Sequence, residues 1–197
     1  MIDTLFIGTS NEHKKQEIKS IFEKNGLSIN IKTPKDFNDN DEPVEDGFSF
    51  EENATIKAEY YHKKYNIACL AEDSGICIDY LNDYPGIHSK RFLGNLNDHD
   101  KNEKILEIMN GIENRKASFH CVICYIDDLG NKHIFEGINN GEISKVQIGE
   151  FGFGYDPIFL IPEYNKTEAE LGEEYKNEYG HRAKAFDKFI EYIKDEK

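Results

Sequence analysis

The sequence lacks any apolar run that could cross a lipid bilayer. A membrane-spanning helix needs about 20 predominantly apolar residues, and no hydrophobic stretch of the 197-residue chain approaches that length. The N-terminus is also unlike a secretory signal, because the apolar residues of MIDTLFIG precede the basic ones instead of following them. We therefore predict a soluble, globular protein of the cytoplasm with no membrane partner.

Positive charge is scarce. The chain has 24 Lys and Arg against 38 Asp and Glu, a formal net charge of −14. Proteins that bind nucleic acid or an anionic membrane over a large surface need a basic face, so we expect no nucleic-acid partner either. An anionic ligand would instead require a few cations gathered at one place, together with a divalent metal recruited by carboxylates.

Cysteine is sparse as well, with four residues in the chain: Cys69, Cys77, Cys121 and Cys124. Cys121 and Cys124 form a C-x-x-C pattern, which raises the question of zinc or a disulfide. The pattern lies within ASFHCVICYI, a predicted strand, and residues three apart on a strand point to opposite faces of a sheet. We therefore expect buried, reduced cysteines.

The length fits a single domain over residues 1–197, which two lobes could share. Hydrophobic periodicity and capping residues predict helices at 12–25, 49–65, 98–110 and from Arg182 onward. Short apolar runs predict strands at 2–8, 27–33, 67–71, 75–81, 116–127, 132–139, 142–148 and 157–161. Helices and strands mix without strict alternation, so we predict an α/β fold with an elongated, mixed sheet.

Four segments hold residues suited to binding a nucleotide. The first is a predicted turn between a strand and a helix, formed by Thr9, Ser10, Asn11, Glu12, His13 and Lys14. Free amides in the first turn of a helix bind anions, and Lys14 could reach a phosphate. Ordinary capping of the helix by Ser10 or Asn11 is the simpler interpretation.

The second segment is an acidic loop over residues 36–46. Its candidate ligands for a hard, oxygen-seeking cation are Glu42, Glu45 and Asp46. Lys57, on the helix that follows, could hold a phosphate. Most acidic loops are simply solvated and most surface lysines are inert, so neither feature is decisive by itself.

The third segment is Glu72-Asp73-Ser74-Gly75, predicted as an acidic elbow between two strands. Adjacent carboxylates at a strand end could bind Mg²⁺ and accept a proton from a water molecule. A polar turn closed by its own hydrogen bonds is the alternative.

The fourth segment runs from position 151 to position 184. Its glycines allow a ligand to approach the backbone closely. The aromatic residues offer flat faces for a planar base, and they are Phe151, Phe153 and Tyr155. Cations for an anionic ligand follow at Lys176, His181 and Arg182. A glycine-rich turn beside a solvated helix would also explain this pattern.

These segments, in this order, resemble the inosine/xanthosine triphosphate pyrophosphatase family over nearly the whole chain. The matching blocks are T-S-N-x-x-K at 9–14, F-x-E-N-A-x-x-K-A at 50–58, E-D-S-G at 72–75, P-G-x-x-S at 85–89, and F-G-Y-D-P-I-F at 153–159 with K-x-x-x-x-H-R at 176–182. The last block is the most specific. The resemblance implies two lobes around a central cleft and a homodimer.

The resemblance also implies an activity, the cleavage of ITP, dITP and XTP to the monophosphate and pyrophosphate. Mg²⁺ is the implied cofactor, and Mn²⁺ could replace it. A water activated by the metal would attack the α-phosphorus, which would remove deaminated purines from the nucleotide pool. Two other interpretations stay open: a pyrophosphatase for dUTP, dTTP or a modified base, and a nucleotide-binding sensor without turnover.

Roles for individual residues follow from the matching positions. Asp73 would be the general base and a metal ligand, assisted by Glu72 and Glu45. Glu42 competes with Glu45, because Val44 stands where family members often carry the loop glutamate. Residues 9–14, Lys57 and Lys176 would hold the phosphates. The nucleoside would be held by Ser74, Phe153, Gly154, Tyr155, Asp156, His181 and Arg182, the last two near its 6-oxo group.

Overall fold

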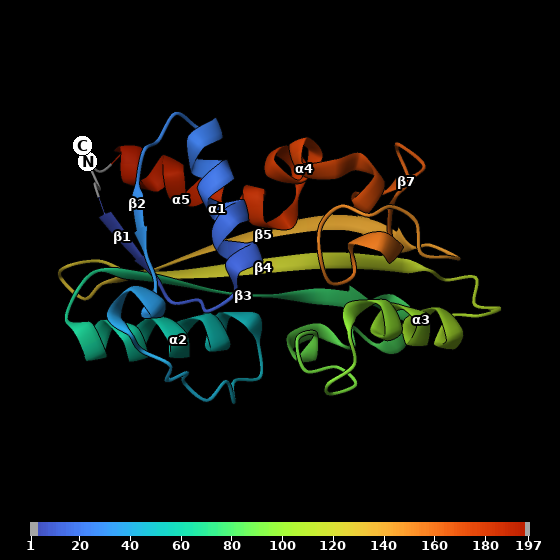
Figure 1. The fold of residues 1–197 in the computed structure, drawn as a ribbon, viewed down its shortest axis with the longest axis horizontal. Coiled ribbons are helices and arrows are strands. Elements are labelled where there is room, and N and C mark those ends of the chain that lie inside the picture. Colours follow the sequence, from blue (N-terminus) through green and yellow to red (C-terminus); the bar gives the residue numbers. More distant parts are fainter. Residues whose placement is uncertain (1–3, 196–197) are drawn as a thin grey trace. The chain divides into compact units, whose positions relative to one another are not determined.

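The computed structural model describes residues 4–195. Its strands are β1 (Thr4–Ile7), β2 (Asn30–Lys32), β3 (Cys69–Ile78), β4 (Lys116–Ile126), β5 (Lys132–Ile143), β6 (Phe159–Ile161) and β7 (Lys166–Thr167). They form one sheet of seven strands in the order β2-β1-β3-β4-β5-β6-β7 (Figure 1). β1 is parallel to β2 and β3, whereas β6 is antiparallel to β5 and β7. The predicted mixed α/β fold is therefore confirmed.

The helices are α1 (Glu12–Lys24), α2 (Phe50–Tyr65), α3 (Asp98–Ile108), α4 (Glu168–Tyr179) and α5 (His181–Asp195). Short 3-10 turns lie at η1 (Pro34–Phe37), η2 (Asp79–Leu81), η3 (Gly86–His88) and η4 (Asp156–Ile158). Side chains that accept backbone hydrogen bonds cap the starts of four helices, and these are Asn11, Ser49, Asn97 and Thr167. Within residues 4–195, no helix has the length and hydropathy that a membrane crossing requires.

The chain divides into two compact units. The first unit is drawn from the ranges Met1–Asp73, Cys121–Gly137 and Arg182–Lys197. The second unit is drawn from Ser74–His120 and Ile138–His181. The strands β3, β4 and β5 contribute residues to both units.

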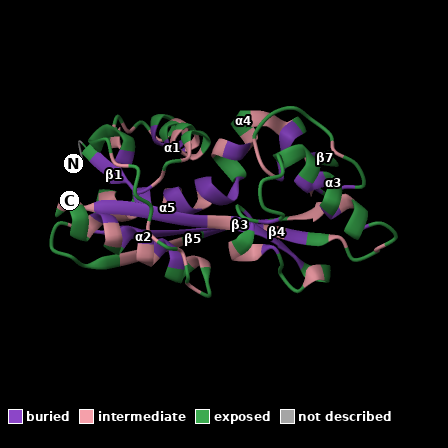
Figure 2. Cartoon of the chain, turned by 60° about the horizontal axis from the view of Figure 1, so that its bottom comes forward, coloured by how far each residue is buried: buried purple, intermediate pink, exposed green. Residues whose placement is uncertain are grey.

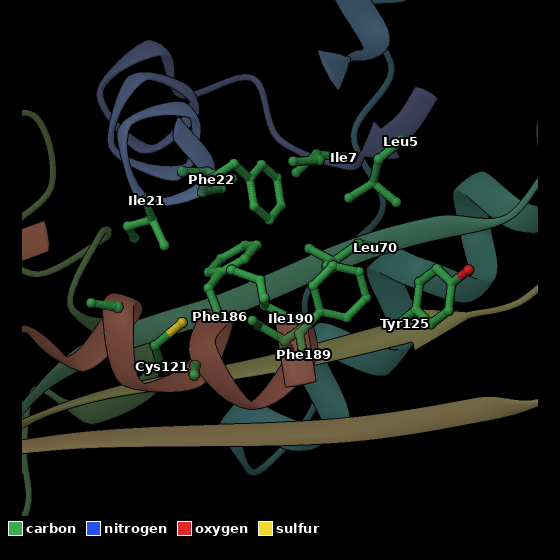
Figure 3. Close-up of a cluster of buried hydrophobic side chains, with 14 residues drawn as sticks. Leu5, Ile7, Ile21, Phe22, Leu70, Cys121, Tyr125, Phe186, Phe189 and Ile190 are labelled. Carbon is green, nitrogen blue, oxygen red and sulfur yellow. The ribbon is translucent and has the colours of Figure 1, made fainter. Parts of the chain in front are cut away.

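The first unit packs α1 and α5 on one face of its strands and α2 on the other (Figure 1). On the α1/α5 face, the rings of Phe22, Phe186 and Phe189 meet Leu70 and its neighbours in one buried cluster (Figure 3). A second cluster under α2 contains Phe6, Ala58 and Tyr61. Burying each large apolar side chain contributes roughly 1.5–3 kcal/mol, so both faces of these strands stabilise the first unit.

The second unit has its own core, centred on Phe119 and Phe159, whose ring centroids lie 4.4 Å apart. Ile76 of β3, Ile105 of α3 and Met109, the C-cap of α3, belong to the same core. The helices α3 and α4 lie in this unit together with the loop at residues 151–156.

Several predicted elements are confirmed. The helices at 12–25, 49–65 and 98–110, and the helix that starts near Arg182, correspond to α1, α2, α3 and α5. The long hairpin is present as β4 and β5, and residues 2–3 of the first predicted strand lie outside the described residues. All four cysteines are free and buried, as expected. Cys121 packs on the α1/α5 face and Cys124 on the α2 face, so the predicted opposite orientation is confirmed.

Two predictions of local structure are wrong. The acidic elbow does not exist, because β3 runs without interruption through residues 72–74. Most of this strand is buried (Figure 2). The strand expected at 142–148 is only the end of β5, which stops at Ile143. In addition, the charged segment before His181, for which the sequence predicts no element, forms α4, whose start is fixed by the Thr167 and Glu170 capping box.

Candidate active site

The central strand β3 carries two buried carboxylates next to each other. Adjacent residues of a strand point to opposite faces of the sheet. Glu72 accordingly faces the side covered by α1 and α5, and Asp73 faces the side covered by α2. The two side chains therefore belong to two separate groups of polar residues in the first unit, here named the Asp73 cluster and the Glu72 cluster.

The Asp73 cluster consists of Asp73, Lys57, Glu45 and Asn53. The Lys57 ammonium lies 3.0 Å from Asp73 Oδ1 and 2.9 Å from Glu45 Oε2. Asn53 is fully buried and donates from Nδ2 to Asp73 Oδ2 over 3.2 Å. Asn53 and Lys57 lie four residues apart on α2 and so share one helix face. Both oxygens of Asp73 therefore accept hydrogen bonds from α2.

Burial and charge oppose each other in this cluster. Burial raises the pKa of the Asp73 carboxyl above its ordinary value, and the charges of Lys57 and Lys14 offset only part of that rise. Burial alone would lower the pKa of Lys57, but Asp73 and Glu45 outweigh it, so the Lys57 pKa is raised. A carboxylate with a raised pKa accepts a proton more readily than an exposed one.

The donor set of the Asp73 cluster suits a divalent cation. The carboxylates of Asp73 and Glu45 converge on one positive charge, the Lys57 ammonium. Carboxylate oxygens are the ligands that Mg²⁺ prefers, so these two residues fit the predicted metal. Among the described residues, no three His, Cys, Asp or Glu side chains gather in a way that could hold an ion.

The Glu72 cluster is an ion-pair network. Glu72 Oε1 lies 2.9 Å from the Lys14 ammonium and 3.3 Å from Arg182 Nη2. The Cys121 thiol donates to Glu72 Oε2 over 3.1 Å. Arg182 Nη1 also pairs with Glu17 on α1, at 2.8 Å. Glu72 and Arg182 are almost completely buried, so each charge is stabilised by its ion-pair partners in place of water.

The charges of this network control its ionisation. Burial alone would raise the pKa of Glu72, but Arg182 and Lys14 outweigh it and hold that pKa well below its ordinary value. The Glu72 carboxylate is thus ionised and surrounded by cations. The sequence predicted Glu72 beside Asp73 at a metal; the contacts differ from that expectation, because the uninterrupted strand turns the two side chains to opposite faces.

The turn at residues 9–14 begins α1. Asn11 caps the helix by accepting from the backbone amides of His13 and Lys14. Ser10 donates to Glu42 in the acidic loop. Glu12 pairs with Lys35 at 2.7 Å. Within this turn, Lys14 contacts the buried Glu72 carboxylate of β3, while the His13 side chain is exposed.

The second unit contains the glycine-aromatic loop (residues 151–156). The Asp156 carboxylate accepts from the Phe153 amide over 2.8 Å and pairs with the Lys176 ammonium at 2.7 Å. The same ammonium lies 4.8 Å from the centroid of the Phe153 ring. Gly152 has φ +86°, and a Cβ on it would lie 2.0 Å from Asp156 Oδ2. Only glycine fits there.

Other predicted nucleoside ligands also lie in the second unit. The Tyr155 hydroxyl donates to the Ser89 carbonyl over 2.8 Å, and burial raises the Tyr155 pKa above its ordinary value. His181 stacks on Phe119, with ring centroids 4.7 Å apart. Ser74 is partly exposed on β3.

The predicted residues therefore form groups within each unit. In the first unit, Glu45, Lys57 and Asp73 meet in one cluster, and Lys14 and Arg182 meet at Glu72. In the second unit, Phe153, Asp156 and Lys176 are in contact.

Three contacting residues received no role from the sequence: Asn53, Glu17 and Cys121. The helical spacing from Lys57 could have identified Asn53, which lies in the block at 50–58. Similarly, Glu17 lies one helical turn after His13 and Lys14 on α1. Nothing in the sequence pairs Cys121 with Glu72, because that contact depends on the register between β3 and β4.

Comparison with known proteins identifies the family of this chain. A model of the Ham1 family matches residues 5–192. The chain belongs to the Ham1 family. Its Ham1 relatives include a dITP/XTP pyrophosphatase of Leptospira interrogans, 42% identical over 193 residues that cover 96% of each chain. A second dITP/XTP pyrophosphatase, from Clostridium perfringens, is 39% identical over 197 residues, 95% of this chain and 96% of the relative.

Solved Ham1 structures share the fold. The Ham1 protein of Staphylococcus aureus matches with a TM-score of 0.88 and 34% identity, covering 98% of this chain and 100% of that one. A HAM1 protein from Coxiella burnetii gives the same TM-score and identity, over 99% and 100% of the two chains. The expected family relationship is thereby confirmed over nearly the full length.

Proposed function

We propose that the protein hydrolyses deaminated purine nucleoside triphosphates, namely ITP, dITP and XTP, to the monophosphate and pyrophosphate. Membership of the Ham1 family, with relatives that are dITP/XTP pyrophosphatases, supports the substrate class. The observation that carries the chemistry is the buried Asp73 carboxylate, held from α2 by Asn53 and Lys57. Such hydrolysis would remove deaminated purines from the nucleotide pool.

Asp73 is the general base in this proposal. Its raised pKa favours acceptance of a proton from the water that attacks the α-phosphorus. Asn53 donates to Oδ2 and so fixes the carboxylate, while Oδ1, which accepts from Lys57 in this structure, would take the proton once Lys57 binds phosphate. Displacement then breaks the bond between the α-phosphorus and the bridging oxygen, and pyrophosphate departs with the electron pair.

Asp73 and Glu45 are the residues that would hold the divalent metal, because both already face one cation. When bound, such a metal supplies positive charge that lowers the pKa of water and neutralises phosphate oxygens. Lys57 would then exchange its carboxylate partners for phosphate oxygens. Lys14 and Lys176 are the other proposed phosphate ligands, and Glu72 acts by holding Lys14 in place.

Nucleoside recognition is assigned to the second unit and to Arg182. The Phe153 ring offers a stacking surface, and the backbone from Phe153 to Asp156 lies next to it. Donors of His181 and Arg182 would face a 6-oxo group. An adenine 6-amino group would leave those donors unpaired, which costs about 1–3 kcal/mol for each buried group.

Release of pyrophosphate from matched concentrations of dITP, ITP, XTP, GTP, ATP, dUTP and dTTP in the presence of Mg²⁺ tests the proposal. We expect rates for the deaminated purines at least about tenfold above that for ATP, whose 6-amino group loses one hydrogen-bonded pair. A preference for dUTP or dTTP would identify a different pyrophosphatase. Saturable ITP binding without pyrophosphate release would identify a sensor. Replacing Mg²⁺ by Mn²⁺ in the same assay compares the two cofactors.

A homodimer and a cytoplasmic location also belong to this proposal, as does the expectation of no nucleic-acid partner. All three follow from the resemblance or from the sequence. Light scattering coupled to size-exclusion chromatography tests the dimer, for which a mass of twice 22.8 kDa is expected. A single-chain mass would contradict it.

A further inference from the structure

The glycine-aromatic loop is held by a helix to which the family resemblance assigns no role. The helix α3 contacts the loop backbone at Gly154, which has φ +64°. Asp98 Oδ2 accepts from the Gly154 amide over 2.8 Å. Asn102 Nδ2 donates to the Gly154 carbonyl over 2.9 Å. Both backbone polar groups of Gly154 are therefore bound by side chains of α3.

The spacing of the two side chains explains how one helix can do this. Asp98 and Asn102 lie four residues apart, so they project from the same face of α3. One is an acceptor and the other a donor, which matches the amide and the carbonyl of glycine. The pair therefore fixes both the position and the orientation of the loop backbone at residue 154.

The buried position of Asn102 lowers the stability of the fold. It is almost completely buried, and its Oδ1 has no hydrogen-bond partner within the described part of the chain. A buried polar atom without a partner destabilises a fold. Its Nδ2 also donates to Gln147 over 3.2 Å, which ties α3 to the segment that precedes the loop. An apolar residue would fill this position more cheaply if packing alone mattered.

The residues on either side of Gly154 are those proposed to bind the nucleoside. The Phe153 amide is bound by Asp156, and the Phe153 ring lies beside the Lys176 ammonium. The Tyr155 hydroxyl is bound by the Ser89 carbonyl. Rotation of the peptide units of Gly154 would turn the Phe153 ring away from its position. The contacts of α3 with Gly154 restrain the backbone between the Phe153 and Tyr155 side chains.

We propose that Asp98 and Asn102 are positioning residues that clamp Gly154 and so hold the Phe153 ring in the orientation for stacking on a purine base. This assignment rests on the proposed function. The clamp acts on binding of the base and not on the phosphate chemistry, since the contacts of Asp73 come from α2 and the acidic loop. Weakening it should therefore raise KM without lowering kcat.

Asp98→Ala is the decisive variant, because Asp98 is exposed and its truncation leaves the core intact. We expect its KM for dITP to rise about tenfold with kcat within about twofold of the parent. IMP should bind correspondingly less tightly, and inhibition by pyrophosphate should be unchanged. Asp98→Asn keeps an oxygen acceptor and should restore the parental KM. Asn102→Ala should resemble Asp98→Ala.

Glu107→Ala is the matched control, because Glu107 is an exposed carboxylate of the same helix that pairs with Lys104. It should leave every parameter unchanged. Hydrogen exchange of the peptide covering residues 151–158 gives a readout that does not require activity. Exchange should rise in Asp98→Ala and stay parental in Glu107→Ala and Asp98→Asn.

An active parent together with an unchanged KM or unchanged exchange in Asp98→Ala would overturn the clamp alone. Impairment of Asp98→Asn equal to that of Asp98→Ala would also overturn it, because charge and not hydrogen bonding would then matter. A parent that releases no pyrophosphate from dITP overturns the proposed function, and the clamp with it.

Discussion

Asp73 is the residue on which the proposed chemistry depends. Replacement by Asn removes the proton acceptor while keeping size and hydrogen-bonding capacity. A general base contributes about 10²–10⁴-fold to a rate, so Asp73→Asn should lower kcat for dITP by at least about a hundredfold. Pyrophosphate release measures the effect, and Asp79→Asn, which alters an exposed Asp directly after the same strand, is the control. Retention of more than about a tenth of the parental kcat would remove Asp73 as the base.

Glu72 has a different role, which appears in the pH dependence of stability. Its folded pKa lies below the unfolded value of about 4.5. The ionised carboxylate therefore stabilises the fold fully above that value, and the contribution is lost as pH falls below it. At neutral pH, Glu72→Gln should lower the free energy of unfolding by about 3–5 kcal/mol, since it leaves Arg182 with less compensation.

The difference between the parent and Glu72→Gln should shrink progressively below about pH 4.5. Denaturant unfolding at a series of pH values measures this trend. Glu23→Gln, which alters an exposed carboxylate of α1, provides the comparison and should show no such pH dependence. A stability gap that stays constant or widens on acidification would contradict the assigned network.

At the scale of elements, the glycine-aromatic loop depends on Gly152. Gly152→Ala would direct a methyl group into the Asp156 carboxylate, which holds the Phe153 amide and Lys176. We expect a loss of about 1–3 kcal/mol in stability and a higher KM for dITP. Gly130→Ala is a close control, because Gly130 has a similar φ of +83° but open space around it. Equal effects of both substitutions would attribute the loss to backbone strain alone.

Periodicity and capping were sufficient to predict most helices. The helix α2 illustrates this, because Ser49 caps it and the buried Ala54, Ala58 and Tyr61 follow helical spacing. The continuous strand β3 could not be predicted in the same way. A Glu-Asp-Ser sequence is typical of a turn, and it is tolerated inside a buried strand only because α1, α2 and α5 supply cations and donors from distant parts of the chain.

The same limit applies to the candidate site. The family resemblance implied that Asp73, Lys57 and Glu45 would serve one site, with Glu42 as the alternative to Glu45, and Asp73, Lys57 and Glu45 lie in contact. The remaining contacts depend on which face of the sheet each side chain occupies. Since the strand separates Glu72 from Asp73, only the tertiary structure reveals that Glu72 pairs with Arg182 and Lys14. Likewise, the contact of Asp98 with Gly154 joins residues that are 56 positions apart.

At the scale of the whole molecule, the dominant property is the net charge of −14. Like charges repel one another in a compact fold, and salt screens this repulsion over a Debye length of about 10 Å at 0.1 M. Raising NaCl at neutral pH should therefore raise Tm. The increase should be smaller near the isoelectric point of about 4.9. Calorimetric or spectroscopic melting curves measure both effects, and a falling Tm at neutral pH would mean that attractive ion pairs dominate.

Alkylation of the four buried cysteine thiols can report on opening of the fold. Burial raises the pKa of Cys69 to about 12 and that of Cys77 to about 11, so neither reacts readily as a thiolate in the native state. Cys77 belongs to the second unit, and Cys69, Cys121 and Cys124 belong to the first. Alkylation followed residue by residue with mass spectrometry would therefore time the unfolding of each unit separately, without any engineered label.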